Sequence, residues 1–314
     1  MLSDPALNRL QALMRDGNSE GEDRYELLTT LGRGGMGTVY LARDAALDRE
    51  VALKVLDSID PMIAARLAQE ARILGRLEHP GIVPVHDFGR LADGRLFYAM
   101  KRVRGERLDR WIGNVDLHTR LGVFLRICEA VSFAHAHQVI HRDLKPENVM
   151  IGEFGEVLVL DWGIARVLNR ADDSLSAATP TPIKPTINTA HGTVVGTPAY
   201  MSPEQARGDV ATIDQRTDIY ALGALLSTLT AGADSGALDA IATKARADLP
   251  DDRYQTAQDL AADVSRFVAG LAVRARREPL FDRIARIARR YRTPLLLILT
   301  YLVARLFLFW AFRV

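Results

Sequence analysis

The most constraining feature of this chain is the string HRDLKPEN at residues 141–148, which places an acid, a lysine and an amide within six residues. These are Asp143, Lys145 and Asn148, and a second acid, Asp161, follows 18 residues after Asp143. Asp161 ends a run of apolar residues typical of a buried strand, where an unpaired carboxylate is unfavourable. Hard cations take oxygen ligands such as Asp161 and Asn148, and the remaining acid can accept a proton from an attacking hydroxyl. The spacing therefore indicates a site for a magnesium-bound polyphosphate.

A glycine-rich stretch, LGRGGMGTVY at residues 31–40, is the second feature. The spacing of Gly32, Gly34 and Gly37 lets backbone N–H groups approach phosphate oxygens without a Cβ between them. Alone the pattern is weak, because glycine-rich hairpin turns are common. A dinucleotide-binding fingerprint would need a helix directly after the glycines, whereas residues 38–41 continue as a strand, which disfavours that alternative.

A lysine, Lys54, stands in the middle of the apolar strand pattern VALKVL. Lysine is seldom buried without a partner, and Glu70, in the next helical stretch RLAQEARIL, is the expected one. A structural salt bridge would explain the same two residues, so both interpretations stay open.

Composition and periodicity divide the 314-residue chain into two lobes. With 48% apolar and 25% charged residues, the chain can bury a large core. Short β-rich runs at 37–43 and 50–56, with one helix at about 61–77, predict a small and mostly β lobe. A glycine-containing linker at 104–106 precedes a mostly helical lobe, in which apolar residues of 121–131 keep a helix period.

The single cysteine, Cys128, lies inside that helical pattern. No disulfide framework can form, a reducing compartment is favoured, and we expect a plain core residue. Residues 170–195 are rich in Thr, Ser, Pro and Ala and lack periodicity, as expected of a loop. Residues 1–22 are polar without an apolar stretch of signal-peptide length, so we expect a short helix or loose leader.

Together these motifs resemble the catalytic domain of the eukaryotic-like serine/threonine protein kinases, specifically their bacterial branch. The likeness runs from about Tyr25 to Gly270 and includes GTPAYMSPEQ at 196–205, TDIYALG at 217–223 and DDRYQTAQDL at 251–260. It implies an α+β, bilobal protein kinase fold. The expected organisation is a leader at 1–22, a β-rich N-lobe at 23–103, a larger α-helical C-lobe at 104–272, a basic juxtamembrane segment at 273–293 and a transmembrane helix at 294–312.

The resemblance also implies ATP as the nucleotide and Mg²⁺, or Mn²⁺ in its place, as the metal. Lys54 would grip the α- and β-phosphates while paired to Glu70. Asp143 would be the catalytic base, and Lys145 would stabilise the γ-phosphate. The residues implied to cover the ATP phosphates are Gly32, Gly34 and Gly37.

In the family, the residues matching Asn148 and Asp161 hold the metal, and apolar residues enclose the adenine ring. Met100 falls at the back of this pocket. Ordinary core packing would explain Met100 and Leu31 equally well. The residues that fall where the family sandwiches adenine are Leu31, Val39, Ala52 and Met150.

Further matches imply regulation by a loop phosphate. Arg142 precedes the catalytic acid, and in the family this arginine binds such a phosphate through its guanidinium. Thr197 would contact Asp143 and Lys145, which marks Ser/Thr rather than Tyr specificity. The residues closest to the expected phosphosites are Thr189 and Thr193, with Ser174, Ser176, Thr179, Thr181 and Thr186 as alternatives.

Three further residues match structural positions of the family. Glu204 and Arg253 correspond to a buried ion pair that anchors the end of the loop. Asp218 corresponds to an acid that holds the backbone of the catalytic loop.

Departures from the family are informative as well. Trp162 stands where Phe is usual, stacked with the residues matching His141 and Leu74; its N–H needs a partner if buried. We expect a working site with a shifted inactive-to-active equilibrium. Lys101 replaces a usual acid in the hinge, with little effect on ATP use because hinge contacts to adenine are mainly backbone.

The segment LTAGADSGALDAIATKARA at 229–247 is a larger departure, because it lacks a helix that the family uses for docking substrates and regulators. The catalytic residues are untouched, but substrate recognition and the stability of the lobe are affected.

The tail combines a basic and an apolar segment. Residues 274–314 hold ten arginines against two acids, so this segment carries +8 and residues 1–273 carry −7 of the net +1. The acidic charge of residues 1–273 argues against a nucleic-acid partner, whereas a basic run beside an apolar one indicates a membrane surface. Residues 295–312 contain one charge, Arg305, and would span about 27 Å as a helix.

Twelve Leu, Ile, Val and Phe residues in this segment favour insertion by roughly 4–7 kcal/mol, against roughly 2.5–3.5 kcal/mol for one central arginine. The positive-inside rule then leaves the kinase in the cytoplasm on a single-pass anchor, with 279–292 as a basic amphipathic surface helix. The alternative is an apolar helix packed on the kinase body or in an oligomer.

We therefore expect an ATP- and Mg²⁺-dependent protein serine/threonine kinase at the cytoplasmic membrane, with protein substrates and a homodimer for trans-autophosphorylation. The alternative is a membrane-tethered pseudokinase scaffold that binds ATP without efficient turnover, motivated by the shortened segment near 232–237. A small-molecule kinase is a third alternative, disfavoured because Thr197 and the SPE string at 202–204 belong to the protein-substrate branch.

Overall fold

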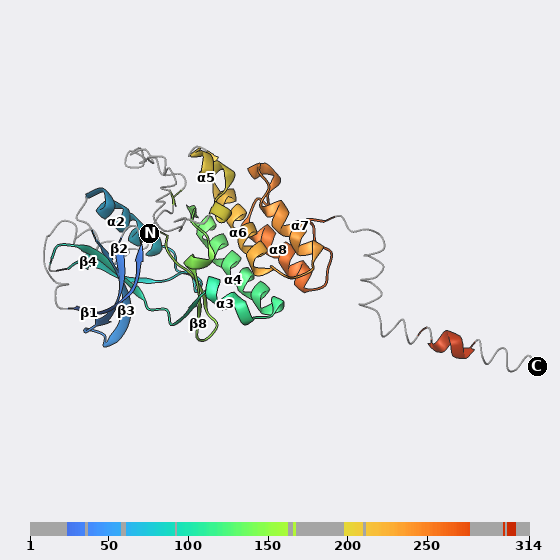
Figure 1. The fold of residues 1–314 in the computed structure, drawn as a ribbon, viewed down its shortest axis with the longest axis horizontal. Coiled ribbons are helices and arrows are strands. Elements are labelled where there is room, and N and C mark those ends of the chain that lie inside the picture. The colour runs from blue at the N-terminus through green and yellow to red at the C-terminus, as the bar shows by residue number, and fades with distance from the viewer. Residues whose placement is uncertain are drawn as a thin grey trace, which may run out of the picture.

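The chain folds into a β-rich lobe and a larger helical lobe (Figure 1). This computed structural model describes residues 24–34, 37–57, 61–91, 93–162, 166–167, 198–209, 212–276, 298 and 300–305. The leader at 1–22 lies outside the described residues, as do Thr197 and all seven expected phosphosites, Ser174, Ser176, Thr179, Thr181, Thr186, Thr189 and Thr193.

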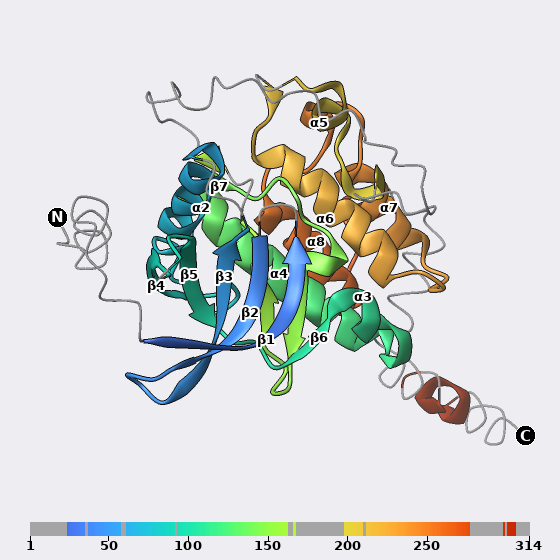
Figure 2. The ribbon, with the colours of Figure 1, turned by 60° about the vertical axis from the view of Figure 1, so that its left-hand side comes forward.

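The N-lobe is a five-stranded antiparallel sheet in the order β1-β2-β3-β5-β4, with one helix, α2, beside it (Figure 2). Strand β2 begins at the last glycine of the glycine-rich stretch, which confirms the predicted strand and excludes the dinucleotide fingerprint. Helix α2 ends three residues before the predicted boundary. The elements are β1 Tyr25–Gly34, β2 Gly37–Asp44, β3 Arg49–Leu56, α2 Pro61–Leu74, β4 Val85–Arg90 and β5 Leu96–Lys101.

The C-lobe is mostly helical, as predicted. Its long central helix α4 (Leu117–Ala136) packs against α6 (Gln215–Leu229) and α8 (Ala257–Val268). It also contacts two short strands, β7 (Val139–Ile140) and β9 (Val157–Val159). The remaining helices are α3 Leu108–Trp111, α5 Pro203–Arg207, α6 Gln215–Leu229, α7 Gly236–Ala245 and α8 Ala257–Val268, with 3₁₀ turns at Ile112–Asn114, Pro146–Asn148, Pro198–Tyr200 and Pro250–Asp252.

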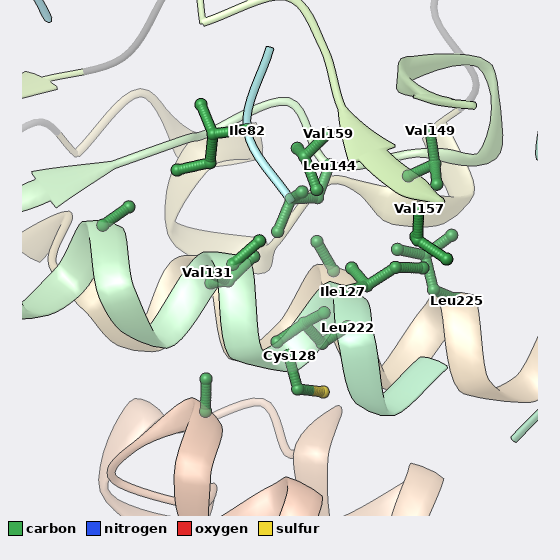
Figure 3. Close-up of a cluster of buried hydrophobic side chains, with 14 of the residues drawn as sticks. Ile82, Ile127, Cys128, Val131, Leu144, Val149, Val157, Val159, Leu222 and Leu225 are labelled. Atoms are coloured by element: carbon green, nitrogen blue, oxygen red, sulfur yellow. The ribbon is translucent and has the colours of Figure 1, made fainter. Parts of the chain in front are cut away.

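Apolar side chains of α4 form the centre of the C-lobe core (Figure 3). Ile127 and Val131 lie between the helix and the strands above it, with Leu222 and Leu225 of α6 close by. Cys128 is 1% exposed, and burial raises the pKa of its thiol. The prediction of a plain core cysteine is confirmed.

The HRDLKPEN string at residues 141–148, called the catalytic segment below, leads directly into β8 of a small sheet with the strand order β6-β8-β9. The linker predicted at 104–106 was wrong in part, because Gly105–Arg107 forms strand β6 and pairs with β8 (Val149–Gly152). A Cβ at Gly105 would lie 2.0 Å from the carbonyl oxygen of Ile151, so this pairing requires glycine. The other short strands are β7 Val139–Ile140, β9 Val157–Val159 and β10 Arg166–Val167.

The backbone that leaves α8 is fixed to the C-lobe by one buried acid. Asp263 is 0% exposed and accepts hydrogen bonds from the backbone N–H groups of Arg274 (2.5 Å) and Ala275 (2.9 Å). The hydroxyl of Tyr254 donates to the same carboxylate at 2.7 Å. The chain therefore stays attached to the lobe through residue 275.

In the part of the chain that the structure describes, no helix has both the length and the apolar character needed to cross a membrane. Of the expected transmembrane segment 294–312, only residues 298 and 300–305 are described, and they are helical. Of the basic segment 273–293, residues 277–293 lie outside the described part.

Candidate active site

The predicted ion pair between Lys54 and Glu70 joins strand β3 to helix α2. The Lys54 ammonium lies 2.9 Å from Oε1 and 3.0 Å from Oε2 of Glu70, which is 1% exposed. It also lies 3.2 Å from Oδ1 of Asp161. Burial alone would lower the pKa of Lys54, but the two carboxylates outweigh it and raise this pKa. The contact with Asp161 favours the site interpretation of the pair over a purely structural one.

Tyr98 on β5 also reaches this pair, and sequence reasoning missed it. Its hydroxyl donates to Oε1 of Glu70 at 2.7 Å, and its side chain is 2% exposed. Burial and the Glu70 charge raise the pKa of Tyr98 far above its usual value, so the hydroxyl keeps its proton. The register places Tyr98 directly opposite Lys54 on the neighbouring strand, a relation that only the paired sheet reveals.

The catalytic segment brings Asp143, Lys145 and Asn148 together. The Lys145 ammonium lies 2.6 Å from Oδ2 of Asp143, and the Asn148 amide donates to the same oxygen at 3.1 Å. A second bond from the Asn148 amide reaches the backbone oxygen of Asp143 at 2.8 Å. The 3₁₀ turn Pro146–Asn148 folds the segment back on itself and makes these contacts possible.

Asp218 of α6 holds the catalytic segment from below, as the resemblance implied. Its carboxylate accepts the backbone N–H groups of His141 and Arg142, each at 2.8 Å, and pairs with Nε2 of His135 at 2.7 Å. Burial works against the charge, but these hydrogen bonds lower the pKa of Asp218 below its usual value. The backbone of Arg142 has φ +71°, a conformation unusual for a residue with a Cβ, and the carboxylate helps to hold it.

Asp161 follows β9 and faces the same space. Its backbone has φ +58°, and the neighbouring backbone N–H of Leu160 donates to the carbonyl of Asn148 at 2.8 Å. The two predicted metal ligands, Asp161 and Asn148, therefore lie on adjoining segments. Desolvation opposes the charge, but the Lys54 ammonium lowers the pKa of Asp161 and keeps it ionised.

Trp162 is packed as the resemblance implied for this position. It is 1% exposed, and its ring centroid lies 4.5 Å from that of His141. Its indole N–H donates to the backbone oxygen of Val159 at 3.3 Å, which supplies the partner that a buried tryptophan needs. Leu74 of α2 belongs to the same apolar cluster.

Four N-lobe residues predicted to bind the nucleotide lie on one face of the sheet. Val39 pairs with Lys54, and Ala52 pairs with Met100, in the register β2-β3-β5. Directly opposite residues of an antiparallel pair project to the same side, so these four side chains face one way. Leu31 on β1 is 50% exposed.

The glycines are placed in the hairpin between β1 and β2. Gly32 pairs with Val39 and Gly34 with Gly37. A Cβ at Gly37 would lie 2.2 Å from the carbonyl oxygen of Val55, so the close approach of β2 to β3 requires glycine there. Met150 comes from β8, on the C-lobe side.

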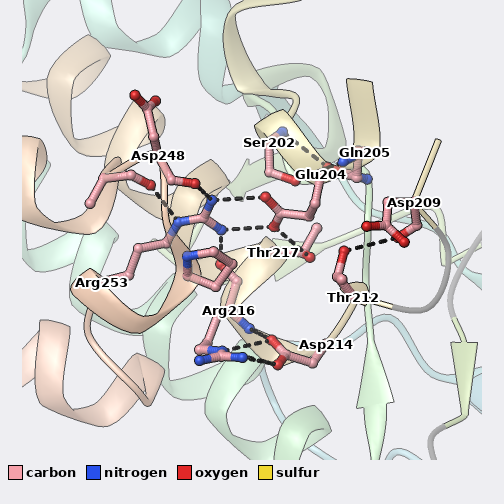
Figure 4. A network of polar contacts seen from close by, with 12 residues as sticks. Ser202, Glu204, Gln205, Asp209, Thr212, Asp214, Arg216, Thr217, Asp248 and Arg253 are labelled. Carbon is pink, nitrogen blue, oxygen red and sulfur yellow. Dashed lines mark hydrogen bonds and ion pairs between the residues drawn. The ribbon is translucent and has the colours of Figure 1, made fainter. Parts of the chain in front are cut away.

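Glu204 and Arg253 form the predicted buried ion pair (Figure 4). Nη1 and Nη2 of Arg253 lie 2.8 Å from Oε1 and Oε2 of Glu204, and the two residues are 1–2% exposed. Although burial opposes it, the hydrogen bonds from Arg253 lower the pKa of Glu204 to about 2. The pair fixes α5 to the segment before α8.

Gln205 is a further residue that sequence reasoning missed. Its side-chain oxygen accepts the backbone N–H of Ser202 at 3.2 Å, closing a capping box at the start of α5. Its amide nitrogen donates to the backbone oxygen of Arg142 at 2.7 Å. The pattern S-x-x-Q signals the cap, but only the fold shows the link to the catalytic segment.

The donor set fits a nucleotide-bound magnesium ion. Among the described residues, no three His, Cys, Asp or Glu side chains gather into a metal site. Magnesium commonly takes only one or two carboxylates from a protein and completes its shell with phosphates and water. A carboxylate at Asp161 and an amide at Asn148, beside the Lys54 ammonium, match that requirement.

This fold and site define a protein kinase domain. The protein kinase domain family matches residues 25–271, so the chain belongs to the protein kinase family.

Among its curated relatives, serine/threonine-protein kinase PknD of Protochlamydia amoebophila is 40% identical over 227 residues, which cover 66% of this chain and 23% of the relative. Serine/threonine-protein kinase PknB of Mycolicibacterium smegmatis is 37% identical over 288 residues, covering 80% of this chain and 44% of the relative. Serine/threonine-protein kinase pkn3 of Myxococcus xanthus is 41% identical over 221 residues, covering 67% and 38%. The chain spans less than half the length of these relatives.

Proposed function

We propose that the chain is a protein serine/threonine kinase that transfers the γ-phosphate of ATP to Ser/Thr hydroxyls of proteins. The observation that carries the proposal is that the predicted site residues form two groups, and the side chains within each group are in contact. Lys54 of the N-lobe contacts both Glu70 and Asp161, while Lys145 and Asn148 converge on Asp143. The serine/threonine-protein kinases among the relatives support the choice of hydroxyl substrate.

In this reaction, Asp143 accepts the proton of the substrate hydroxyl as its oxygen bonds to the γ-phosphorus. The bond from that phosphorus to the bridging oxygen breaks, and ADP leaves with the electron pair. Lys145, held 2.6 Å from Oδ2 of Asp143, offsets negative charge on the transferring group. Asn148 and Asp161 would hold Mg²⁺ or Mn²⁺, which would supply positive charge to neutralise the phosphates.

Labelled ATP with magnesium tests this proposal directly. The full chain is expected to label itself and a generic protein substrate, whereas Asp143→Asn and Lys54→Met lose at least about a hundredfold of this activity. Incorporation no greater than that of the two variants would contradict the proposal.

A pseudokinase scaffold is the second candidate, favoured by one observation. Helices α6 and α7 are joined by residues 230–235 alone, so the docking helix expected from the family has no room here. The scaffold predicts that ATP binds with ordinary affinity while no label is transferred. Equilibrium binding of a fluorescent ATP analogue, measured beside the labelling assay, separates the two candidates.

We further propose that the kinase is anchored in the cytoplasmic membrane by its C-terminal segment. Support comes from the basic run before the apolar run and from the described part of that segment. Residues 300–305 are helical, and Tyr301, Leu302 and Val303 are 53–63% exposed. That exposure favours the anchor over an apolar helix packed on the kinase body. Membrane fractionation with a carbonate wash tests it, since soluble recovery of both the full chain and a tail-deleted chain would contradict it.

Trans-autophosphorylation in a homodimer is the last element of the proposal. An Asp143→Asn copy is mixed with a wild-type copy of different size, and label is expected on the inactive copy. Label confined to the wild-type copy, at a rate independent of concentration, would mean that phosphorylation occurs within one chain.

A further inference from the structure

Two hydrogen-bond donors on neighbouring strands meet at one buried carboxylate. Lys54 of β3 and Tyr98 of β5 are direct cross-strand partners, so both side chains leave the same face of the sheet. Both reach Oε1 of Glu70, at 2.9 Å and 2.7 Å. The face on which they meet is the one against which α2 lies (Figure 2). Helix α2 is therefore tied to the sheet at Glu70 by two strands.

The two donors differ in what else they contact. The Lys54 ammonium is shared with Asp161 at 3.2 Å, and in the proposed function it also binds the ATP phosphates. The Tyr98 hydroxyl lies inside the interface of sheet and helix, at 2% exposure of its residue. When Lys54 also pairs with the phosphates, its charge is shared among more partners, so the fully buried Glu70 carboxylate is less completely compensated, which is unfavourable. Tyr98 leaves it one donor that the nucleotide does not compete for.

We propose that Tyr98 is a positioning residue. Through its bond to Glu70 it holds α2 in the position in which Glu70 pairs with Lys54, with or without bound nucleotide. The Tyr98 hydroxyl stays protonated beside the Glu70 carboxylate, so it keeps donating this hydrogen bond. The proposal deepens the proposed function and rests on it for its effect on ATP use. The position of α2 itself can be measured without any turnover.

The competing explanation is that Tyr98 merely packs the core and its hydroxyl takes the nearest acceptor. The chain offers a matched control for this. Tyr254 is also buried, at 5% exposure, and its hydroxyl donates to a buried carboxylate, Asp263, at the same 2.7 Å. Tyr254 lies in the C-lobe, remote in the fold from Lys54 and α2. The change from Tyr to Phe removes the same hydroxyl and the same type of bond at both places.

The experiment compares Tyr98→Phe and Tyr254→Phe in the full chain. Amide hydrogen exchange of residues 64–74 is followed without nucleotide, and kcat and KM for ATP are measured with a generic substrate. For Tyr98→Phe we expect faster exchange in α2 and a loss of about tenfold in kcat/KM for ATP, the ratio that one hydrogen bond to a charged group represents. For Tyr254→Phe we expect a lower melting temperature with α2 exchange and ATP kinetics unchanged.

The proposal is overturned if Tyr98→Phe behaves like Tyr254→Phe, losing melting temperature while α2 exchange and kcat/KM for ATP stay at wild-type values. Failure of the proposed function looks different, because the wild-type chain itself would then transfer no label. In that case α2 exchange in the two variants still decides whether Tyr98 positions the helix.

Discussion

Two ion pairs of this protein kinase domain have nearly the same separation but different surroundings. The charged atoms of Lys54 and Glu70 lie 2.9 Å apart, and those of Arg253 and Glu204 lie 2.8 Å apart. The first pair joins a strand to a helix in the N-lobe and borders the proposed nucleotide site. The second joins two segments inside the C-lobe. Distance alone would assign them the same role.

The remaining contacts of each cation separate the two roles. The side chain of Arg253 is 0% exposed and also donates to the backbone oxygens of three residues, Arg216, Ala247 and Asp248. All of its donors are committed to the fold. Lys54 instead has Asp161 as its second partner, and the Asp161 side chain is 51% exposed. The Lys54 ammonium can exchange the solvent-exposed Asp161 carboxylate for a ligand. The Arg253 guanidinium cannot, because backbone carbonyls and Glu204 occupy all of its N–H groups.

The largest expected effect is the loss of Arg253. Arg253→Met leaves the Glu204 carboxylate buried without its cation, and we expect the free energy of unfolding to fall by about 3–5 kcal/mol. Lys54→Met is the matched change in the other pair, and it should cost less than half as much, because Glu70 keeps the hydroxyl of Tyr98. Urea unfolding without nucleotide measures both. Equal losses in the two variants would remove the distinction between the pairs.

An intermediate effect is expected on acidification. The pKa of Glu204 is lowered to about 2 from an ordinary 4.5, so its ion pair stabilises the fold above about pH 4.5, and this contribution is lost as the pH falls toward 2. The contribution is about 3 kcal/mol. Unfolding free energies of wild type and Glu204→Gln should differ most near pH 6 and converge as the pH approaches 2. A difference independent of pH would show that the charge of Glu204 is not what stabilises this region.

The smallest effect is expected at Trp162, which follows Asp161, the solvent-exposed partner of Lys54. Trp162→Phe removes the hydrogen bond to Val159, so the free energy of unfolding should fall by about 1 kcal/mol. The site should stay active, with a changed dependence on loop phosphorylation, measured as the activity ratio before and after phosphatase treatment. If neither activity nor that ratio changes, the expectation that Trp162 shifts the inactive-to-active equilibrium is wrong. The proposed metal role of Asp161 would be unaffected.

The site residues that could be predicted from sequence are those that lie close together in the chain. Asp143, Lys145 and Asn148 fall within six residues, and their spacing already implies that they meet. Strands β2 and β3 and helix α4 could be predicted because their apolar periods are local. These signals need no knowledge of which strand pairs with which.

What sequence could not supply depends on register and on contacts between distant segments. Tyr98 reads as one more apolar residue of a strand until β5 is placed beside β3 and opposite Lys54. Gln205 shows its capping role locally, but its bond to Arg142 joins residues 63 positions apart. Gly105 looked like a linker because the strand that it pairs with, β8, begins at Val149.

The carboxylate of Asp263 limits how far the C-lobe can lie from the segment proposed to enter the membrane. By holding the backbone of Arg274 and Ala275, it leaves residues 276–293 as the only chain between the C-lobe exit and the segment proposed to enter the bilayer at 294. These eighteen residues reach at most about 65 Å when fully extended. If the segment anchors the chain as proposed, the active site would stay within a thin layer along the cytoplasmic face of the membrane. A kinase with a shortened docking region would then choose its substrates largely by where they are.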